Sequence, residues 1–429
     1  MIEQRRSLDD DLAGLAETER TVAGFVAEGL VPGVVLAWQK DGGPVRYHGV
    51  GKLGFESAQP VDEHSIFRIY SQTKPITGIG AMMLIEDGVL TLDQPLADIL
   101  PAFREMRVLV ADGADETRPA ARPITIRHLL THTAGFGMAG MTLNGLYLKH
   151  GILPGTSTHV AGPGESPAPR TLVELGQKLA ALPLAADPGV RFDYSIATDI
   201  LGLVIQTVSG LPFETFLKQR LFDPLRMIDT TFTIAESQTG RFAALPEKKK
   251  DGTWTLADDP HNSHYRAPHY PGGGGGLVST AHDYARFAAM LLNEGELDGA
   301  RVLKPETVRL ARSNLLPRGI DRVDLPLGQT LSGAGFGAAM SVQLEPGHAT
   351  GGAFDWPGAV PAGVYGWPGA GGTACWIDPD RRFFLLFLTQ YWPSWINGTM
   401  RPEVIAAAYR DLQPDVVGAK IANTPEMAG

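Results

Sequence analysis

The chain has 429 residues, of which 44% are hydrophobic and 20% charged, a balance typical of globular proteins that bury a sizeable core. Its formal net charge of −10 argues against nucleic acid as the main partner. Its single cysteine, Cys375, excludes an intrachain disulfide, and no apolar run approaches the length of a membrane span. Because the first residues lack the apolar core of a signal peptide, a cytoplasmic location is expected.

The N-terminal part of the chain predicts a helix followed by strands. Apolar residues recur at helical spacing over residues 12–28. Two β-like runs, Gly33–Trp38 and Val45–Val50, flank a short turn sequence, which predicts a hairpin. A third strand-like run, Phe67–Tyr70, leads into an apolar helix that is expected to end near Gly88.

The start of this helix carries Ser71 and, three residues later, Lys74. Residues three apart share a helical face, so the amine lies within reach of the hydroxyl. This geometry suits a serine nucleophile with an amine base. Pro75 places the helix start close to Ser71, because proline is tolerated only in the first turn. Taken alone, the tetrapeptide favours a capping serine followed by a surface lysine, so the rest of the chain decides.

The middle of the chain is mainly helical, with loop-rich stretches. Helices are expected within Leu90–Pro101, Ile124–Gly135, Leu172–Leu182, Thr198–Ser209 and Phe213–Leu221. The span from Met138 to Arg170 is rich in Gly, Pro, Ser and Thr, which predicts a long loop that covers a site. Five successive glycines, Gly272–Gly276, fit no helix or strand interior. They form either a flexible loop or backbone packed beside a pocket.

The C-terminal part returns to strands. Helices are expected at Ala281–Leu292, Pro305–Asn314 and Pro402–Leu412, and strands at Gly337–Leu344, Thr373–Asp378 and Arg382–Tyr391. Strands early, helices in the middle and strands late predict one sheet built from both ends of the chain, an α+β fold of the α/β-sandwich type. We expect residues 1–70 and 270–429 to form an α/β domain. Residues 71–269 are then a mainly helical domain with long loops, and the nucleophile lies at the interface.

Signatures of other hydrolases are missing. Neither Gly-x-Ser-x-Gly nor His-Glu-x-x-His occurs. His261, His264 and His269 cluster in one segment, but their spacing fits no common zinc pattern. We therefore expect neither a metal nor a cofactor.

Four motifs occur in a fixed order along the chain. They are Ser-x-x-Lys at 71–74, Leu-Leu-Thr-His-Thr-Ala-Gly at 129–135, Pro-Gly-x-x-Phe-x-Tyr-Ser at 188–195 and Gly-Gly-Gly-Leu-Val-Ser-Thr at 274–280. This set resembles the serine β-lactamase and DD-peptidase superfamily, and within it most of all the family VIII carboxylesterases. The resemblance covers about residues 20–410. It implies a β-lactamase-like antiparallel sheet flanked by helices, with an inserted helical lobe.

The resemblance also implies catalytic roles. Ser71 is then the nucleophile, and Lys74 accepts its proton or activates it electrostatically. Tyr194 takes the place of the second base, which passes the proton to the leaving alkoxide. Two residues after this tyrosine the β-lactamases have an asparagine, but this chain has Ile196, a loss that the esterases share.

The last motif departs from the β-lactamases. Their Lys-Thr-Gly is absent, and the matching place carries Trp367 and Gly369, where the esterases have Trp-Gly-Gly. Pro368 departs from the esterase pattern and removes one backbone N–H, so the N–H of Ala370, with that of Ser71, is the expected oxyanion pair. An aromatic wall in place of a cation favours neutral esters over carboxylate-bearing substrates.

Substrate binding is expected from Trp367, Gly369 and Gln72. The predicted function is a serine carboxylesterase that hydrolyses small-molecule esters of small or medium acyl groups through an acyl-serine intermediate. Three alternatives stay open: an acyltransferase with the same acyl-enzyme, a β-lactamase or D-peptidase with weak lactam turnover, and a silent binding protein on this fold. The sequence does not predict the oligomeric state.

Overall fold

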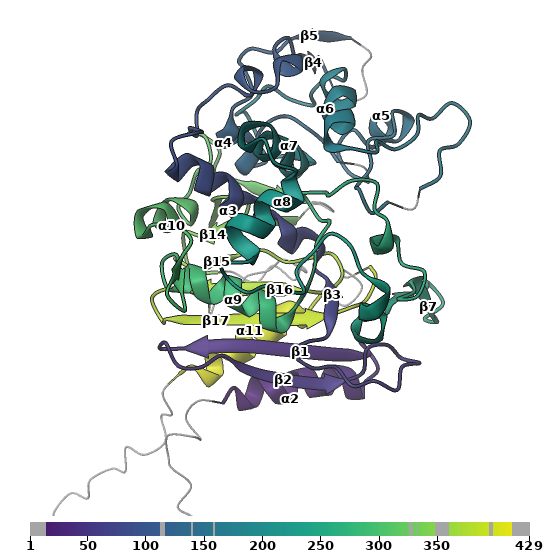
Figure 1. Ribbon diagram of the computed structural model, residues 1–429, viewed down its shortest axis with the longest axis vertical. Helices are drawn as coiled ribbons and strands as arrows, with labels where there is room; N and C mark the ends of the chain where they lie inside the picture. Colours follow the sequence, from purple (N-terminus) through teal and green to yellow (C-terminus); the bar gives the residue numbers. More distant parts are fainter. Residues whose placement is uncertain are drawn as a thin grey trace, which may run out of the picture.

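A computed structural model describes residues 14–111, 116–138, 140–157, 159–325, 329–331, 333–347, 360–393 and 398–413. Its base is a seven-stranded sheet with the order β13-β14-β15-β16-β17-β1-β2 (Figure 1). All pairings within it are antiparallel. The strands are β1 (Gly33–Lys40), β2 (Arg46–Gly51), β13 (Ala334–Phe336), β14 (Ser341–Gln343), β15 (Tyr365–Gly366), β16 (Ala374–Asp378) and β17 (Phe383–Thr389).

The sheet joins the two ends of the chain, because the C-terminal strand β17 pairs with the N-terminal strand β1. Every residue of β17 is buried. This strand lies between β16 and β1, and helices cover both faces of the sheet, which explains why its sequence is continuously apolar. The buried strand predicted within Arg382–Tyr391 is therefore confirmed.

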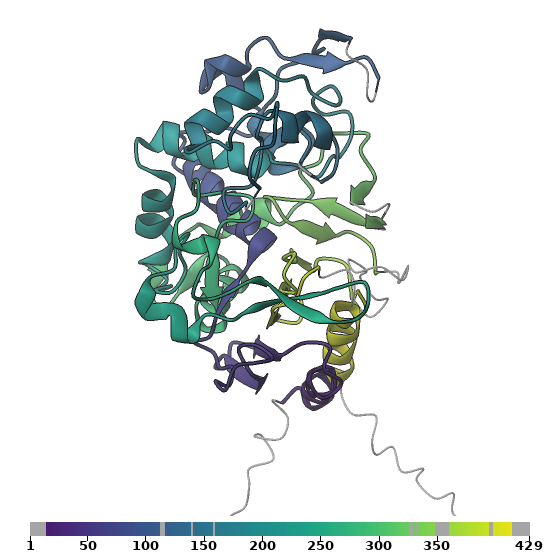
Figure 2. The ribbon, with the colours of Figure 1, turned by 90° about the vertical axis from the view of Figure 1, so that its right-hand side faces the viewer.

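Helices α2 (Ala16–Ala27) and α11 (Met400–Asp411) lie side by side against the sheet (Figures 1 and 2). The carboxylate of Asp411 accepts hydrogen bonds from the backbone N–H groups of Glu17 and Thr18, at 2.9 and 2.8 Å. On the side of the sheet toward the helical part of the molecule, α9 (Ala281–Leu292) packs on β1, β16 and β17. The first and last helices are thus tied to each other as well as to the sheet.

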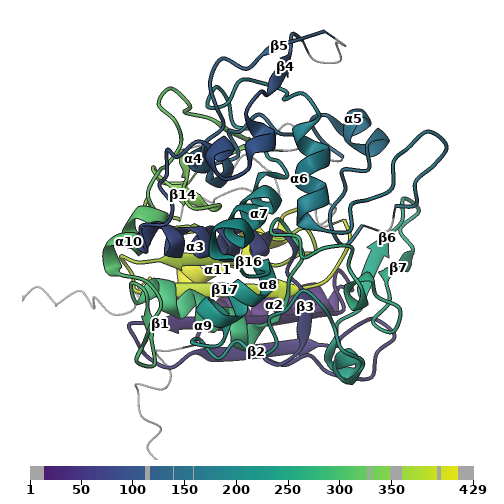
Figure 3. The same ribbon diagram turned by 45° about the horizontal axis from the view of Figure 1, so that its top comes forward.

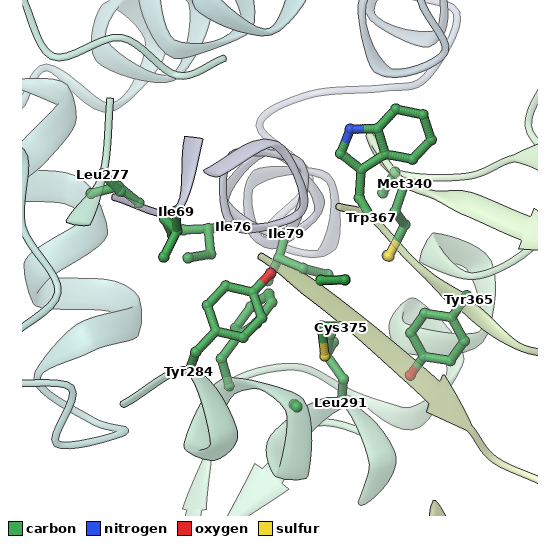
Figure 4. Close-up of a cluster of buried hydrophobic side chains, with 14 of the residues drawn as sticks. Ile69, Ile76, Ile79, Leu277, Tyr284, Leu291, Met340, Tyr365, Trp367 and Cys375 are labelled. Atoms are coloured by element: carbon green, nitrogen blue, oxygen red, sulfur yellow. The ribbon is translucent and has the colours of Figure 1, made fainter. Parts of the chain in front are cut away.

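Helix α3 (Thr73–Glu86) runs through the centre of the molecule, and its residues from Thr73 to Leu84 are all buried. A helix that is apolar on every side belongs in a core. Figure 4 shows Ile76 and Ile79 of α3 close to Tyr284 of α9. A Cβ at Gly78 would lie 2.3 Å from the carbonyl oxygen of Ala338, so glycine lets the helix approach the sheet closely.

Helices α4, α5, α6 and α7 gather on the other side of α3 from the sheet, whereas α8 and α10 lie beside α3 (Figures 1 and 3). The α-helices are α4 (Ile126–Leu130), α5 (Asn144–Lys149), α6 (Leu172–Ala180), α7 (Ala197–Ser209), α8 (Phe213–Leu217) and α10 (Pro305–Ala311). A π-helical turn, Lys218–Phe222, continues α8. Single 3-10 turns occur at Leu96–Asp98, Pro101–Phe103, Glu236–Arg241 and His264–Arg266.

Short two-stranded ribbons complete the fold. They are β3 (Ile66–Arg68) with β8 (Val278–Thr280), β4 (Arg107–Leu109) with β5 (Thr117–Pro119), β6 (Leu245–Lys248) with β7 (Trp254–Asp258), β9 (Glu296–Leu297) with β10 (Ala300–Arg301), and β11 (Val323–Leu325) with β12 (Gln329–Leu331). Among the described helices none is long and apolar enough by itself to cross a membrane. One pair, α7 with the helix Phe213–Phe222, would pass by length and composition together but is bent by 79°.

The expected α+β fold is therefore observed, with three local differences. Residues 138–170 are not only loop, because α5 forms within them. The expected strand Gly337–Leu344 is the end of a hairpin, since the chain turns at Ala339, where φ is +57°, between β13 and β14. The helix expected from residue 12 begins at Ala16 in the described part of the chain. The division at residues 70 and 270 stays a prediction.

Candidate active site

Ser71 lies on a sharp turn between a strand and a helix. Strand β3 pairs with β8 and leads into a 3-10 turn, Tyr70–Gln72, that continues directly into α3. The backbone of Tyr70 has a φ of +43°, a left-handed conformation that is costly for an aromatic residue. Such strain persists only where the surroundings enforce it, and it is frequent at functional sites. Here it presents Ser71, which is partly exposed, at the head of a buried helix.

Lys74 is 1% exposed and is held from two sides. Its Nζ donates to Ser71 Oγ at 3.2 Å and to the carbonyl oxygen of Gly274 at 2.5 Å. The expected spacing of three residues therefore brings amine and hydroxyl together, although Ser71 belongs to the 3-10 turn and Lys74 to α3. The second bond comes from the glycine run.

Tyr194 reaches the same hydroxyl from the segment before α7. Its phenol donates to Ser71 Oγ at 2.8 Å, and the indole N–H of Trp367 donates to the phenol oxygen at 3.2 Å. The Nζ of Lys74 lies 4.7 Å from the centre of the Tyr194 ring. Ser71 Oγ thus accepts hydrogen bonds from both an amine and a phenol. The three residues expected to be catalytic meet at one oxygen atom.

The glycine run, Gly272–Gly276, is packed backbone beside this site and not a flexible loop. A Cβ at Gly273 would lie 2.5 Å from the carbonyl oxygen of Thr198, and one at Gly274 would lie 2.4 Å from Asp199 Oδ2. The carbonyl of Gly273 also accepts a bond from the Thr77 hydroxyl at 2.8 Å. Side chains at Gly273 and Gly274 do not fit against the start of α7, so these two positions require glycine.

Asp199 is a buried carboxyl behind the glycine run that sequence reasoning missed. Burial raises its pKa from 3.8 to about 6, while the positive charge of Lys74 and a bond from the Gly274 N–H act in the opposite direction. Gly274 therefore connects the two charged groups, because its N–H faces Asp199 and its carbonyl accepts from Lys74. The available signal was a single charged residue, Asp199, in the otherwise uncharged sequence of α7.

Two of the residues expected to bind substrate, Trp367 and Gln72, are buried. Trp367 is 2% exposed, and its ring packs against Tyr194 and, edge-on at 5.2 Å, against Phe336. The side chain of Gln72 is buried too, and neither of its amide atoms has a partner among the described residues. Their roles in substrate binding stay predictions, and the hydrogen bond from Trp367 to Tyr194 is a feature that the sequence did not indicate.

The segment expected to complete the oxyanion site runs alongside the nucleophile. A Cβ at Gly369 would lie 2.2 Å from the carbonyl oxygen of Ile69, and one at Gly371 would lie 2.8 Å from the ring of Tyr70. Ala370, between them, is partly exposed. The N–H of Gly369 is already bonded to the carbonyl of Thr373 at 2.8 Å. This arrangement agrees with Ala370, and not Gly369, as the candidate donor.

Other chemistry-bearing residues lie apart from these groups. No set of three or more His, Cys, Asp or Glu side chains within the described ranges is arranged to hold a metal ion. His269 Nδ1 lies 3.2 Å from a guanidinium nitrogen of Arg170. Cys375 on β16 is buried, and burial raises the pKa of its thiol, which keeps it protonated.

Comparison with known proteins places this geometry in a family. "Protein Rv1367c" of Mycobacterium tuberculosis is 35% identical over 381 residues, which cover 85% of this chain and 87% of the relative. "Esterase EstB" of Burkholderia gladioli is 31% identical over 311 residues, 68% of this chain and 71% of the relative. The match to "Esterase EstB" supports the resemblance that the four motifs indicated.

The fold comparison agrees. The structure of "EstCE1, a hydrolase with promiscuous acyltransferase activity" superposes with a TM-score of 0.72 at 25% identity, covering 94% of this chain and 99% of that chain. The family description "Beta-lactamase" matches residues 18–409, nearly the whole chain. The chain therefore belongs to the beta-lactamase family, among relatives that include an esterase.

Proposed function

We propose that this protein is a serine carboxylesterase in which Ser71 is the nucleophile and Lys74 and Tyr194 form its base. One observation carries the proposal: Ser71 Oγ lies within hydrogen-bond distance of both the Lys74 amine and the Tyr194 phenol. A nucleophile in contact with its base, which is itself oriented by a further group, is the general pattern of covalent catalysis. Trp367 is the orienting group here, through its bond to Tyr194.

The reaction proceeds in two steps, acylation and then deacylation of Ser71. In the first step Lys74 acts as a neutral amine: Ser71 Oγ forms a bond to the ester carbonyl carbon while its proton passes to the lone pair of Lys74 Nζ and from there is relayed through Tyr194, and the carbonyl oxygen becomes an oxyanion between the N–H groups of Ser71 and Ala370. The bond to the alcohol oxygen then breaks, and Tyr194 returns the proton to the departing alkoxide. Water repeats the sequence on the acyl-serine, which releases the acid and restores the hydroxyl.

The chemistry around the site favours neutral esters over carboxylate-bearing lactams. Trp367 stands where the β-lactamases present a lysine, and Ile196 replaces their asparagine. Arg401 does bond to the carbonyl of Gly369, but it is 5% exposed and so is not available to a substrate carboxylate. The relative "Esterase EstB" is consistent with this preference.

Acyl transfer is a second candidate function, because an acyl-serine can be resolved by an alcohol as well as by water. The similarity to EstCE1, described as a hydrolase with promiscuous acyltransferase activity, supports acyl transfer as a candidate activity. Incubation with a p-nitrophenyl ester and increasing concentrations of a competing alcohol separates the two. Ester product that rises in proportion to the alcohol indicates transfer, and free acid throughout indicates hydrolysis.

The nucleophile is tested with a panel of p-nitrophenyl esters of graded acyl length. Ser71→Ala is expected to abolish turnover, and mass spectrometry of enzyme treated with a phosphonate probe is expected to find the label on Ser71. Full activity in Ser71→Ala, or a label on another residue, contradicts the assignment. Nitrocefin turnover as fast as ester turnover contradicts the ester preference. A cytoplasmic location belongs to the proposal as well, and cell fractionation tests it.

A further inference from the structure

We propose that His132 is a positioning residue for Tyr194. It bonds to the residues before and after Tyr194 and packs against the tyrosine ring, which keeps the phenol next to Ser71. This inference rests on the proposed function and deepens it. His132 belongs to the segment between α4 and α5, is fully buried, and has no direct bond to Ser71 or Lys74 among the hydrogen bonds of the described residues.

The backbone on either side of Tyr194 is bonded to this one histidine. The N–H of Asp193 donates to the carbonyl oxygen of His132 at 2.8 Å. The N–H of Ser195 donates to His132 Nδ1 at 3.2 Å, and the Ser195 hydroxyl lies at the same distance from that nitrogen. Tyr194 therefore stands between two residues that are both fixed to His132. Its backbone position is set by a residue 62 places earlier, as the numbering of the printed sequence shows.

The imidazole also fixes the direction of the phenol ring. Its centre lies 4.7 Å from that of the Tyr194 ring, and Trp367 contacts the same ring at 5.5 Å. The imidazole is in turn packed against Phe192 at 5.7 Å and Phe336 at 5.5 Å. A tyrosine ring confined by neighbours cannot swing away, which keeps its oxygen 2.8 Å from Ser71 Oγ. Displacing a catalytic group by about 1 Å can cost on the order of 100-fold in rate.

The bonding pattern specifies the form of the imidazole. A backbone N–H always donates, so Nδ1 of His132 must be an unprotonated acceptor, and the ring proton is on Nε2. Burial, together with the positive charge of Lys74, lowers the pKa of His132 well below its ordinary value. The neutral ring therefore persists across the range in which an esterase works. His132 holds Tyr194 in place and does not take part in proton transfer.

The backbone at His132 adds a constraint. Its φ is +53°, a left-handed conformation in which asparagine is well tolerated and β-branched residues are not. The amide oxygen of Asn lies close to where Nδ1 of histidine stands, so His132→Asn keeps the acceptor and the backbone conformation while it removes the ring. His132→Leu removes both the acceptor and the ring, and the N–H of Ser195 is left buried without its partner.

The test is a double-mutant cycle on ester turnover. His132→Leu is expected to lower kcat about 100-fold with KM nearly unchanged, and His132→Asn to recover a large part of that loss. Because His132 acts through Tyr194, the double variant His132→Leu/Tyr194→Phe is expected to be no slower than Tyr194→Phe alone. Labelling of Ser71 by a fluorophosphonate reports whether the site is intact.

His128 provides a matched control. It is a second buried histidine four residues earlier, and its Nδ1 also accepts a backbone N–H, from Thr125 at 3.1 Å. His128→Leu is expected to lower stability while leaving kcat unchanged. If His132→Leu does not fold, His132→Gln replaces it, because the longer side chain cannot place its oxygen at the Nδ1 position.

Three results overturn the proposal: wild-type kcat in the His132 variants, multiplicative losses in the double variant, or equal loss of kcat in His128→Leu. They are distinguishable from failure of the proposed function. Activity retained in Ser71→Ala removes the function itself. If Ser71→Ala is inactive and Tyr194→Phe is slow, but the His132 variants have the wild-type kcat, then the proposed function stands and only the positioning role of His132 is refuted.

Discussion

The oxygen of Tyr194 makes two hydrogen bonds, because it donates to Ser71 Oγ while it accepts the indole N–H of Trp367. A donor aimed at a phenol oxygen stabilises negative charge that develops there when the phenol gives up its proton. In the proposed mechanism, Trp367 therefore contributes electrostatics as well as packing.

Trp367→Phe tests this contribution. The ring remains aromatic but the N–H is lost, so kcat is expected to fall about 10- to 100-fold, the worth of a hydrogen bond to a charged group. Steady-state kinetics with a p-nitrophenyl ester measure the change. Trp376→Phe on β16 removes the same atoms from another buried tryptophan and is expected to leave kcat unchanged. Equal effects of the two substitutions would show that only packing matters.

Asp199 gives a prediction on pH and stability. Its pKa is raised to about 6 in the folded protein from an ordinary 3.8. Between these values the folded chain keeps a proton that the unfolded chain has released, so this group makes the protein less stable as pH rises through the window. At about 1.4 kcal/mol per pKa unit, the cost reaches about 3 kcal/mol above pH 6.

Asp199→Asn removes this cost because it cannot ionise. Relative to the wild type, the variant is expected to gain up to about 3 kcal/mol in the free energy of unfolding between pH 4 and pH 7. Urea unfolding of both proteins at the two pH values measures the difference. A gap between variant and wild type that stays constant with pH would contradict the raised pKa.

At the scale of elements, the glycine run connects α3 to the start of α7. Its Gly274 carbonyl accepts a hydrogen bond from Lys74, and its lack of side chains leaves room for the Asp199 carboxyl. Gly274 has no left-handed φ, so the requirement for glycine there is steric and not conformational.

Gly274→Ala is therefore expected to lower both stability and turnover. Its Cβ would lie 2.4 Å from Asp199 Oδ2, and relief of such overpacking typically costs about 1–3 kcal/mol. The displaced carbonyl would also loosen Lys74, so kcat is expected to fall at least 10-fold, an estimate based on misplacement of a catalytic group. Gly24→Ala in α2, where a Cβ meets nothing within 4 Å, is the control. It is expected to stabilise the helix by about 0.5–1 kcal/mol.

Elements with a strong local signal in the sequence could be predicted, and those made by tertiary contacts could not. Strand β17 is apolar at nearly every position, and α7 ends at Gly210, which adopts the left-handed conformation of a C-cap. By contrast, β15 has only two residues, too few for any period. In the hairpin turn between β13 and β14 the positive φ falls on Ala339, and not on Gly337, the only glycine of the turn, so the residue types do not indicate its geometry.

The same division holds within the site. Ser71, Lys74 and Tyr194 could be found because their motifs occur in a fixed order. The bond from Trp367 to Tyr194 joins residues 173 apart, and the contacts of His132 follow only from the packed fold. Chemistry encoded in short motifs is therefore readable from one sequence, whereas the support around it depends on the tertiary structure.

On the scale of the whole molecule, the two ends of the chain stabilise each other. The residue before α2 provides no capping side chain, and Asp411 at the end of α11 takes that role by accepting from Glu17 and Thr18. The Thr18 hydroxyl adds a third bond to the same carboxylate at 2.8 Å.

Asp411→Ala is expected to lower the free energy of unfolding by about 1–2 kcal/mol, the usual cost of losing a helix N-cap. Ester turnover at 25 °C is expected to stay at the wild-type level. Thermal unfolding followed by circular dichroism measures the stability. Asp380→Ala, an exposed aspartate between β16 and β17, serves as the control, and an equal shift in both variants would contradict a capping role.

The pairing of β1 with β17 also has a consequence for biosynthesis. The hydroxyl of Thr389 donates to the carbonyl of Gly33, 356 residues earlier in the chain. At translation rates of about 5–20 residues per second, β1 leaves the ribosome roughly 20–70 s before β17, the strand with which it pairs, has been synthesised. During that interval an apolar strand has an unpaired edge, which is a template for aggregation. Folding yield in cells should therefore depend on chaperones that bind nascent chains more than on the stability of the finished enzyme.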